Sequence, residues 1–183
     1  MQASELFNQP NTILLDGGMG TMLQAAGMKL GTRPEDLNIE NPELIRSIHA
    51  KYAAAGSRIV NANTFGASPH KLADSKYTLE EVITAGIANC KQAVAPYGAL
   101  VTLDVGPLGE LLEPSGTLAF EDAVAEYGRI VRAGVAAGAD LIFFETFTDL
   151  YELKAALLAA KENSTLPILA SMSFEAGGRT FTG

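Results

Sequence analysis

The stretch Ile13-Leu14-Leu15-Asp16-Gly17-Gly18-Met19-Gly20-Thr21 places a carboxylate and three glycines where an apolar run ends. The apolar run predicts a strand over residues 13–15, and the residues from Met19 to Ala26 predict a helix that Gly27 ends. The glycines let a ligand approach the backbone, whose bare N–H groups favour an anion. With Asp16 beside them, this turn could hold both ends of an amino acid, although an ordinary glycine-rich turn has the same pattern.

The alternation of apolar run and amphipathic helix repeats along the chain. Further strands are predicted over residues 58–60, 100–103, 141–144 and 168–172. The helices predicted between them cover residues 42–55, 79–94, 120–135 and 149–157, with Asp149 and Glu152 as a helix cap and residues 29–41 as an irregular excursion. Apolar strands separated by helices indicate a parallel sheet covered by helices, in either a doubly wound sheet or a β/α barrel.

Polar residues at the strand ends favour the barrel. The residues in question are Asp16, Asn61 with Asn63, Asp104, Glu145 and Ser173. Polar groups at every carboxyl end, converging on one mouth, are typical of a barrel, whereas a doubly wound sheet gathers them at one switch point. About five parallel strands are predicted, while a closed (β/α)8 TIM barrel needs eight and typically ~250 residues. Residues 1–183 are therefore predicted to be one domain, the first part of an incomplete barrel.

The composition limits the partners of this chain. Of its 183 residues 48% are hydrophobic, which suffices for one core, and the formal net charge is -8. A sequence pI near 4.7 argues against nucleic acid or an anionic membrane as partner, because both attract basic surfaces. The single cysteine, Cys90, excludes an internal disulfide, and no apolar leader follows Met1. These observations predict a cytoplasmic protein with a small-molecule ligand or a protein partner.

Asp16 and Glu145 are the pair predicted to carry the site. Placed on the first and fourth strands of a barrel, their carboxylates would point into the same mouth and could hold an ammonium group. Asp104, which precedes Gly106-Pro107, is instead interpreted as an acceptor of backbone N–H bonds in its own loop. Asn63 and Thr64 could orient a carboxylate or an amide by neutral hydrogen bonds.

The histidines and the cysteine indicate no further site. His49 adjoins an apolar helix face, which is typical of packing, and His70 has no partner at metal-ligand spacing. Cys90 lies in an apolar helix stripe and is predicted to be a buried core residue. The sequence therefore predicts no metal site within these residues.

Several segments together resemble the homocysteine S-methyltransferase family, most closely its cobalamin-dependent branch, the methionine synthases. The matching segments, in order, are Leu15-Asp16-Gly17-Gly18-Met19-Gly20-Thr21, Arg33-Pro34-Glu35-Asp36-Leu37-Asn38, Ile48-His49-Ala50-Lys51-Tyr52, Asn63-Thr64-Phe65-Gly66-Ala67, Asp104-Val105-Gly106-Pro107, Leu112-Glu113-Pro114-Ser115-Gly116-Thr117, Phe144-Glu145-Thr146 and Gly177-Gly178-Arg179-Thr180-Phe181-Thr182-Gly183. They span nearly the whole chain, which makes the set highly specific.

The resemblance implies a β/α barrel in which zinc binds the thiol of homocysteine as a thiolate. A methyl group then passes to that sulfur from methylcobalamin, which folate- and cobalamin-binding modules of the full-length protein supply. Zinc would convert a thiol of pKa ~8.5 to its nucleophilic form at neutral pH. By the same resemblance Asp16 and Glu145 would bind the substrate ammonium and the amides of Gly17, Gly18 and Met19 its carboxylate, while Asn63 and Thr64 would line the pocket.

One departure from the family limits the expected activity. The family holds its zinc with cysteines on later strands, and Cys90 matches none of them. We therefore expect a fragment that lacks methyltransferase activity by itself. Two alternatives stay open: a family member that uses betaine or a methylsulfonium donor, and a non-catalytic amino-acid-binding or assembly module that self-associates through the open edge of its barrel.

Overall fold

The computed structural model describes residues 7–182 with the exception of residues 9 and 30. Residue 30 of the predicted excursion and Gly183 of the last family motif lie outside the described residues. The helices are α2 (Met19–Ala25), η1 (Pro34–Asp36), α3 (Leu37–Glu40), α4 (Pro42–Ala54), α5 (Leu79–Val94), η2 (Ala95–Tyr97), α6 (Phe120–Ala136) and α7 (Leu150–Asn163). The strands are β1 (Ile59–Asn61), β2 (Leu100–Val105), β3 (Leu141–Phe147) and β4 (Ile168–Met172).

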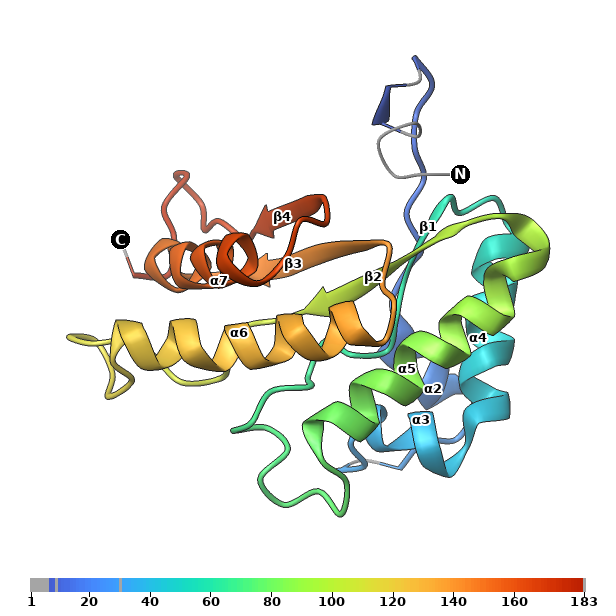
Figure 1. Cartoon of the computed structure of the whole chain (residues 1–183), viewed down its shortest axis with the longest axis horizontal. Coiled ribbons are helices and arrows are strands. Elements are labelled where there is room, and N and C mark those ends of the chain that lie inside the picture. The colour runs from blue at the N-terminus through green and yellow to red at the C-terminus, as the bar shows by residue number, and fades with distance from the viewer. Residues whose placement is uncertain (1–6, 9, 30, 183) are drawn as a thin grey trace.

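The strands of the described chain form one parallel sheet in the order β1-β2-β3-β4 (Figure 1). Each strand therefore lies beside its neighbour in sequence, with Asn61 opposite Thr102 and Asp104 opposite Phe143. A doubly wound sheet reverses its strand order at a switch point, and this sheet has no such reversal. The α/β fold is thus that of an incomplete barrel, as the polar strand ends predict.

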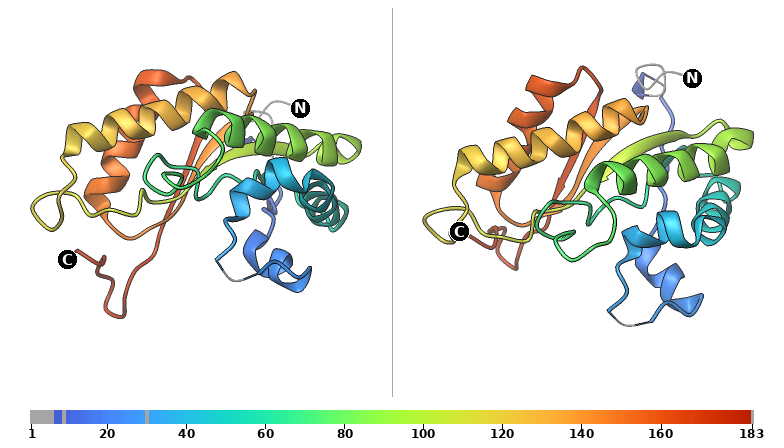
Figure 2. Two further views of the ribbon diagram at one scale, coloured as in Figure 1. Left: turned by 90° about the horizontal axis from the view of Figure 1, so that it is seen from below. Right: turned by 60° about the horizontal axis from the view of Figure 1, so that its bottom comes forward.

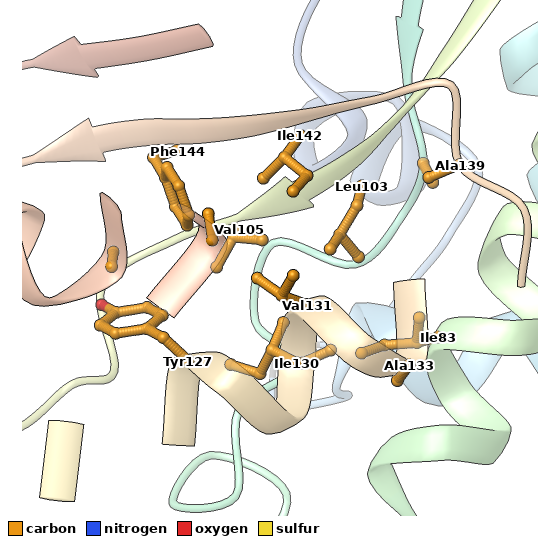
Figure 3. Packing of buried hydrophobic residues seen from close by; sticks show 14 of the residues in the cluster. Ile83, Leu103, Val105, Tyr127, Ile130, Val131, Ala133, Ala139, Ile142 and Phe144 are labelled. Carbon is orange, nitrogen blue, oxygen red and sulfur yellow. The ribbon is translucent and has the colours of Figure 1, made fainter. Parts of the chain in front are cut away.

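Helices α5, α6 and α7 cover one face of the sheet, as Figure 2 shows. Alternate residues of the strands point towards these helices and form the main core, for example Leu103, Val105 and Phe144. In Figure 3 these side chains meet Tyr127 and Val131 of α6. We call this the outer face of the sheet.

The opposite, inner face of the sheet changes from apolar to polar along the strands. Ile59, Leu100 and Leu141 form a small buried cluster near the strand starts. Two residues further along, the Thr102 hydroxyl donates a hydrogen bond of 2.8 Å to Asn61 Oδ1. Two residues beyond Thr102 comes Asp104, so the side-chain layers of the inner face end in an acid at the carboxyl end of the sheet.

The predicted first strand over residues 13–15 is wrong in extent. Only Leu15 pairs, in an isolated parallel bridge with Ile59, and Leu14 accepts backbone hydrogen bonds from Arg58 and Ile59. Leu14 and Leu15 are 54% and 38% exposed, so this segment has the sheet on one side only. The sheet thus has four strands with a single bridge at its first edge, where about five strands were predicted.

Two local predictions also need correction. The excursion over residues 29–41 contains the short helices η1 and α3. Asp149 caps α7 by accepting the N–H of Tyr151, but Glu152 does not complete the cap, because its carboxylate lies in the core. Within the described residues, no helix has the length and apolar character that crossing a membrane requires.

Candidate functional site: an acidic pocket at the carboxyl end of the sheet

A pocket of about 360 Å³ opens where the strands end. Most sequence-predicted site residues line it, and so do several residues that the sequence did not single out. The lining residues are Asp16, Gly17, Gly18, Met19, Gly20, Pro34, Glu35, Asn61, Asn63, Phe65, Asp104, Glu145 and Thr146. The structure thus brings Asp16 and Glu145 together at one mouth, as the strand-end pattern predicts.

The glycine turn that opens this pocket is held in place by α4 and by the loop after it. The Tyr52 hydroxyl donates a hydrogen bond of 3.1 Å to the Gly18 carbonyl, and the Ser57 hydroxyl one of 3.2 Å to the Leu15 carbonyl. A Cβ on Gly17 would lie only 3.0 Å from the Tyr52 hydroxyl oxygen. Gly17 therefore lets Tyr52 fix the turn whose backbone lines the pocket.

A bulge in β3 brings two consecutive residues into the pocket. The register of β3 against β4 shifts between Phe144 and Phe147, and both phenylalanines are buried in the core of the outer face. Glu145 and Thr146 between them both line the pocket. Thr146 has a φ of 61°, which is uncommon for a threonine, and its N–H donates to Ser171 Oγ at 3.0 Å. Backbone strain of this kind is often found at functional sites.

Asp16 sits in the pocket as a partly satisfied acid. Its Oδ2 accepts the Asn61 N–H at 3.1 Å, whereas its buried Oδ1 has no hydrogen-bond partner. Burial raises the pKa of Asp16 to about 7, against the lowering effect of the Asn61 hydrogen bond, and Glu145 raises it further. A bound cation would reverse this shift, because an opposite charge favours the ionised form.

Asp104 belongs to this pocket, so the interpretation that it is satisfied in its own loop is wrong. It is only 5% exposed, and its Oδ1 has no hydrogen-bond partner. Burial raises its pKa well above the ordinary value, and Glu145 and Asp16 raise it further. Burial also raises the pKa of Glu145, which lines the same pocket. The pocket therefore gathers a third acid next to the predicted pair.

Asn63 and Thr64 have different places. Asn63 lines the pocket, but its Nδ2 donates to the Pro34 carbonyl at 2.8 Å and to Asn38 Oδ1 at 2.9 Å. Thr64 is not among the lining residues, since its hydroxyl bridges the backbone of Asp104, donating to the carbonyl at 2.8 Å and accepting the N–H at 3.2 Å. Thr64 thus fixes the strand end that carries Asp104, and a direct substrate contact for either residue stays a prediction.

Sequence reasoning missed Glu35 and Phe65 as pocket residues. Glu35 is 5% exposed, accepts the Gly66 N–H at 2.7 Å, and has a pKa that burial raises. Phe65 lies over Gly106, where a Cβ would come within 2.7 Å of the ring. Both residues stand inside the segments that carry the family resemblance, which was their only signal.

The described residues do not fit a zinc ion. No group of three or more His, Cys, Asp or Glu among them is arranged to hold a metal. Cys90 is fully buried, with its Sγ 3.8 Å from the Val60 carbonyl, and His49 is fully buried as well. Both placements agree with the predicted packing roles.

Comparison with known proteins supports the resemblance. The chain is 30% identical to methionine synthase of Mycobacterium tuberculosis (strain ATCC 25618 / H37Rv), over 92% of this chain and 16% of that protein. The fold matches the homocysteine methyltransferase MmuM from Escherichia coli in its oxidised form, with a TM-score of 0.77, 27% identity, and coverage of 92% of this chain and 64% of that one. The metallated form matches with a TM-score of 0.74 and 25% identity, over 97% and 70%.

The chain thus spans less than a fifth of the methionine synthase and about two thirds of the MmuM chains. The match to the family described as Homocysteine S-methyltransferase extends over residues 13–183. Because that match covers nearly the whole sequence, the chain belongs to the homocysteine S-methyltransferase family.

Proposed function

We propose that this chain binds homocysteine in the acidic pocket and forms the amino-acid-binding half of a methionine synthase site. The observation that carries the proposal is the convergence of Asp16, Glu145 and the Gly17–Met19 backbone in one pocket. The acids offer acceptors for the ammonium group of an amino acid. Backbone N–H groups of the glycine turn are donors of the kind that bind its carboxylate.

The proposed reaction moves a methyl group from its donor to the sulfur of homocysteine, which gives methionine. Zinc, when bound by family members, supplies the thiolate form of that sulfur. The residues of this chain would orient the amino acid so that its side chain points away from the acids. Methylcobalamin is the donor we propose, because of the similarity to methionine synthase.

Betaine or a methylsulfonium compound are the alternative donors. The residues that line the pocket are assigned to the amino-acid end of the substrate, and that end is common to all three reactions. Because of the similarity to methionine synthase, folate- and cobalamin-binding modules are proposed partners of the full-length protein. The cytoplasmic location stays a prediction from the sequence.

Calorimetric titration of the chain with homocysteine tests the binding function. We expect saturable binding that weakens at least tenfold in Asp16→Asn, because the variant loses a charged contact to the ammonium. Asp74→Asn, which changes an exposed acid, is the matched control and should bind like the parent chain. Unchanged affinity in Asp16→Asn would show that the proposed ammonium contact is wrong.

We also propose that the chain alone does not transfer methyl groups. The lack of a metal-binding cluster among the described residues supports this expectation. The test is to mix the chain with homocysteine, zinc and methylcobalamin and to measure methionine. Zinc-dependent turnover would refute the proposal, whereas binding without turnover is the expected result.

An assembly module is the second candidate, and the exposed end of the sheet favours it. Phe174, just after β4, is 60% exposed, and Leu150 at the start of α7 and Phe181 are 62% and 63% exposed. The residues of β4 itself are not fully buried either. Strand edges and apolar patches of this kind promote association. Sedimentation would show a dimer or larger species under this reading, and a monomer at high concentration would count against it.

A further inference from the structure

The inner face of the sheet carries more acid than an ammonium group needs. Asp16 and Glu145 suffice to hold one ammonium, yet Asp104 lines the same pocket. Its side chain is 5% exposed, and its Oδ1 has no hydrogen-bond partner. A buried acid that lines a pocket and has an unpartnered oxygen points to a ligand or a proton as its missing partner.

Among the described residues, no positively charged group around Asp104 compensates the negative charge of its carboxylate. The charged groups that act on it are Glu145 from β3, Asp16 from the glycine turn and Glu35 from η1, all of them acidic. The cations Lys71 and Arg33 act on Glu35 instead. Asp104 and Glu145 line the same pocket, and the charge of Glu145 disfavours ionisation of Asp104, so one proton on the two carboxyls relieves their repulsion.

We propose that the Asp104–Glu145 pair holds one proton in the free pocket and releases it to solvent when an ammonium group binds. The inference rests on the proposed function, since it assigns a proton to the same pocket. Before binding, the pair carries a single negative charge. After binding, the ligand keeps its three ammonium protons, both carboxylates are ionised, and the proton of the pair passes to buffer. A cation within about 4–6 Å lowers the pKa of a carboxyl, which drives this release.

Proton release gives the pocket a means of selection. A ligand with an ammonium group replaces the proton by its own charge, so the pocket accepts it without leaving the acids uncompensated. A ligand of the same length without that group leaves the proton in place. The pocket is therefore expected to distinguish amino acids from the corresponding deaminated acids.

The test is titration calorimetry of the chain with homocysteine near pH 8 in two buffers of different ionisation enthalpy. At this pH Asp16, with a pKa of about 7, is mostly ionised already, so the buffer dependence reports on the pair. We expect release of roughly one proton per homocysteine bound. Two measurements should bring the number close to zero: 4-mercaptobutyrate as the ligand, and Asp104→Asn with homocysteine. Asp74→Asn should release the same number as the parent chain.

A ligand-free measurement separates this inference from the proposed function. In the carboxyl-carbon NMR spectrum, the chain should show a carboxyl that titrates well above the ordinary range of aspartate and disappears in Asp104→Asn. If homocysteine does not bind but this carboxyl is present, the proposed function fails while the pair still holds its proton. Binding with the same proton release in Asp104→Asn, or a spectrum in which all carboxyls titrate in the ordinary range, would overturn the inference.

Discussion

Glu152 and Asp104 are two acids buried on opposite faces of one sheet, and they differ in what surrounds them. Both are nearly inaccessible, at 3% and 5% exposed. On the outer face, Glu152 Oε1 accepts the Leu108 N–H and the Tyr127 hydroxyl, each at 2.8 Å. On the inner face, Asp104 lines the pocket and its buried Oδ1 has no hydrogen-bond partner. The two acids are thus almost equally buried, but Glu152 has hydrogen-bond donors around it and Asp104 Oδ1 has none.

This difference separates a structural acid from a functional one. Burial raises the pKa of both groups, but the donors around Glu152 counteract the rise, whereas every neighbour that acts on Asp104 adds to it. A satisfied buried acid ties helix α7 to α6 and to the loop after β2. An unsatisfied buried acid lowers the stability of the fold, and a ligand that binds to it can remove this free-energy cost.

The largest expected effect comes from truncating the structural acid. Glu152→Ala leaves the Leu108 N–H and the Tyr127 hydroxyl without an acceptor in the core, so we expect a loss of about 2–4 kcal/mol in the free energy of unfolding. Urea denaturation measures it. Glu162→Ala, on the exposed side of the same helix, should change little. If Glu152→Ala were as stable as this control, the two acids would not differ as argued.

On the other face the corresponding change should have the opposite sign. Asp104→Asn removes an acid that burial and neighbouring carboxylates disfavour, so we expect it to raise the free energy of unfolding by about 1–2 kcal/mol near pH 8. The same denaturation experiment applies. A destabilised Asp104→Asn would mean that the carboxyl contributes to the fold rather than to ligand binding.

The pH dependence of stability should carry the signature of the inner face. Asp16 has a pKa of about 7 when folded and an ordinary value of 3.8, so the folded chain binds more protons between these values and its stability falls as pH rises from about 4 to 7. His49 acts oppositely: burial lowers its pKa to about 4 from 6.5, so its contribution is lost as pH falls below about 6.5.

Asp16→Asn isolates the first of these contributions. The variant should lack the fall in stability towards pH 7, with a difference of at most about 1–2 kcal/mol because Asp16 is partly exposed. Denaturation midpoints at several pH values, for the parent chain and the variant, give the two curves. Parallel curves would contradict the raised pKa of Asp16.

The outer face of the sheet follows closely from the sequence. The apolar runs at residues 100–103, 141–144 and 168–172 became β2, β3 and β4, and the helix stripes became α5 and α6, because burial against a neighbouring layer dictates a regular pattern. The strand predicted over residues 13–15 did not form in full, because a strand also needs a neighbouring strand to pair with and only Leu15 has such a pair. Local pattern cannot reveal how many neighbours a segment has.

The inner face follows less completely. Strand ends predicted that Asp16 and Glu145 share one mouth, and the pocket places them there. Asp104 was misassigned because the glycine and proline after it are also typical of a self-contained turn. The bulge that brings Thr146 beside Glu145 depends on the pairing of β3 with β4, which no spacing within either strand encodes.

The smallest expected effect concerns the wall of the pocket. Gly106 leaves room for the Phe65 ring, whose nearest atom would lie 2.7 Å from an added Cβ. Because Phe65 is 38% exposed, the ring in Gly106→Ala can move, and we expect nearly parental stability but about threefold weaker homocysteine binding. Phe65→Leu should make Gly106→Ala harmless, because the smaller side chain removes the collision and the two changes are then non-additive. Additive losses of homocysteine affinity in the double variant would show that Gly106 acts on the pocket independently of Phe65. The shape of the inner face would then depend on the backbone alone.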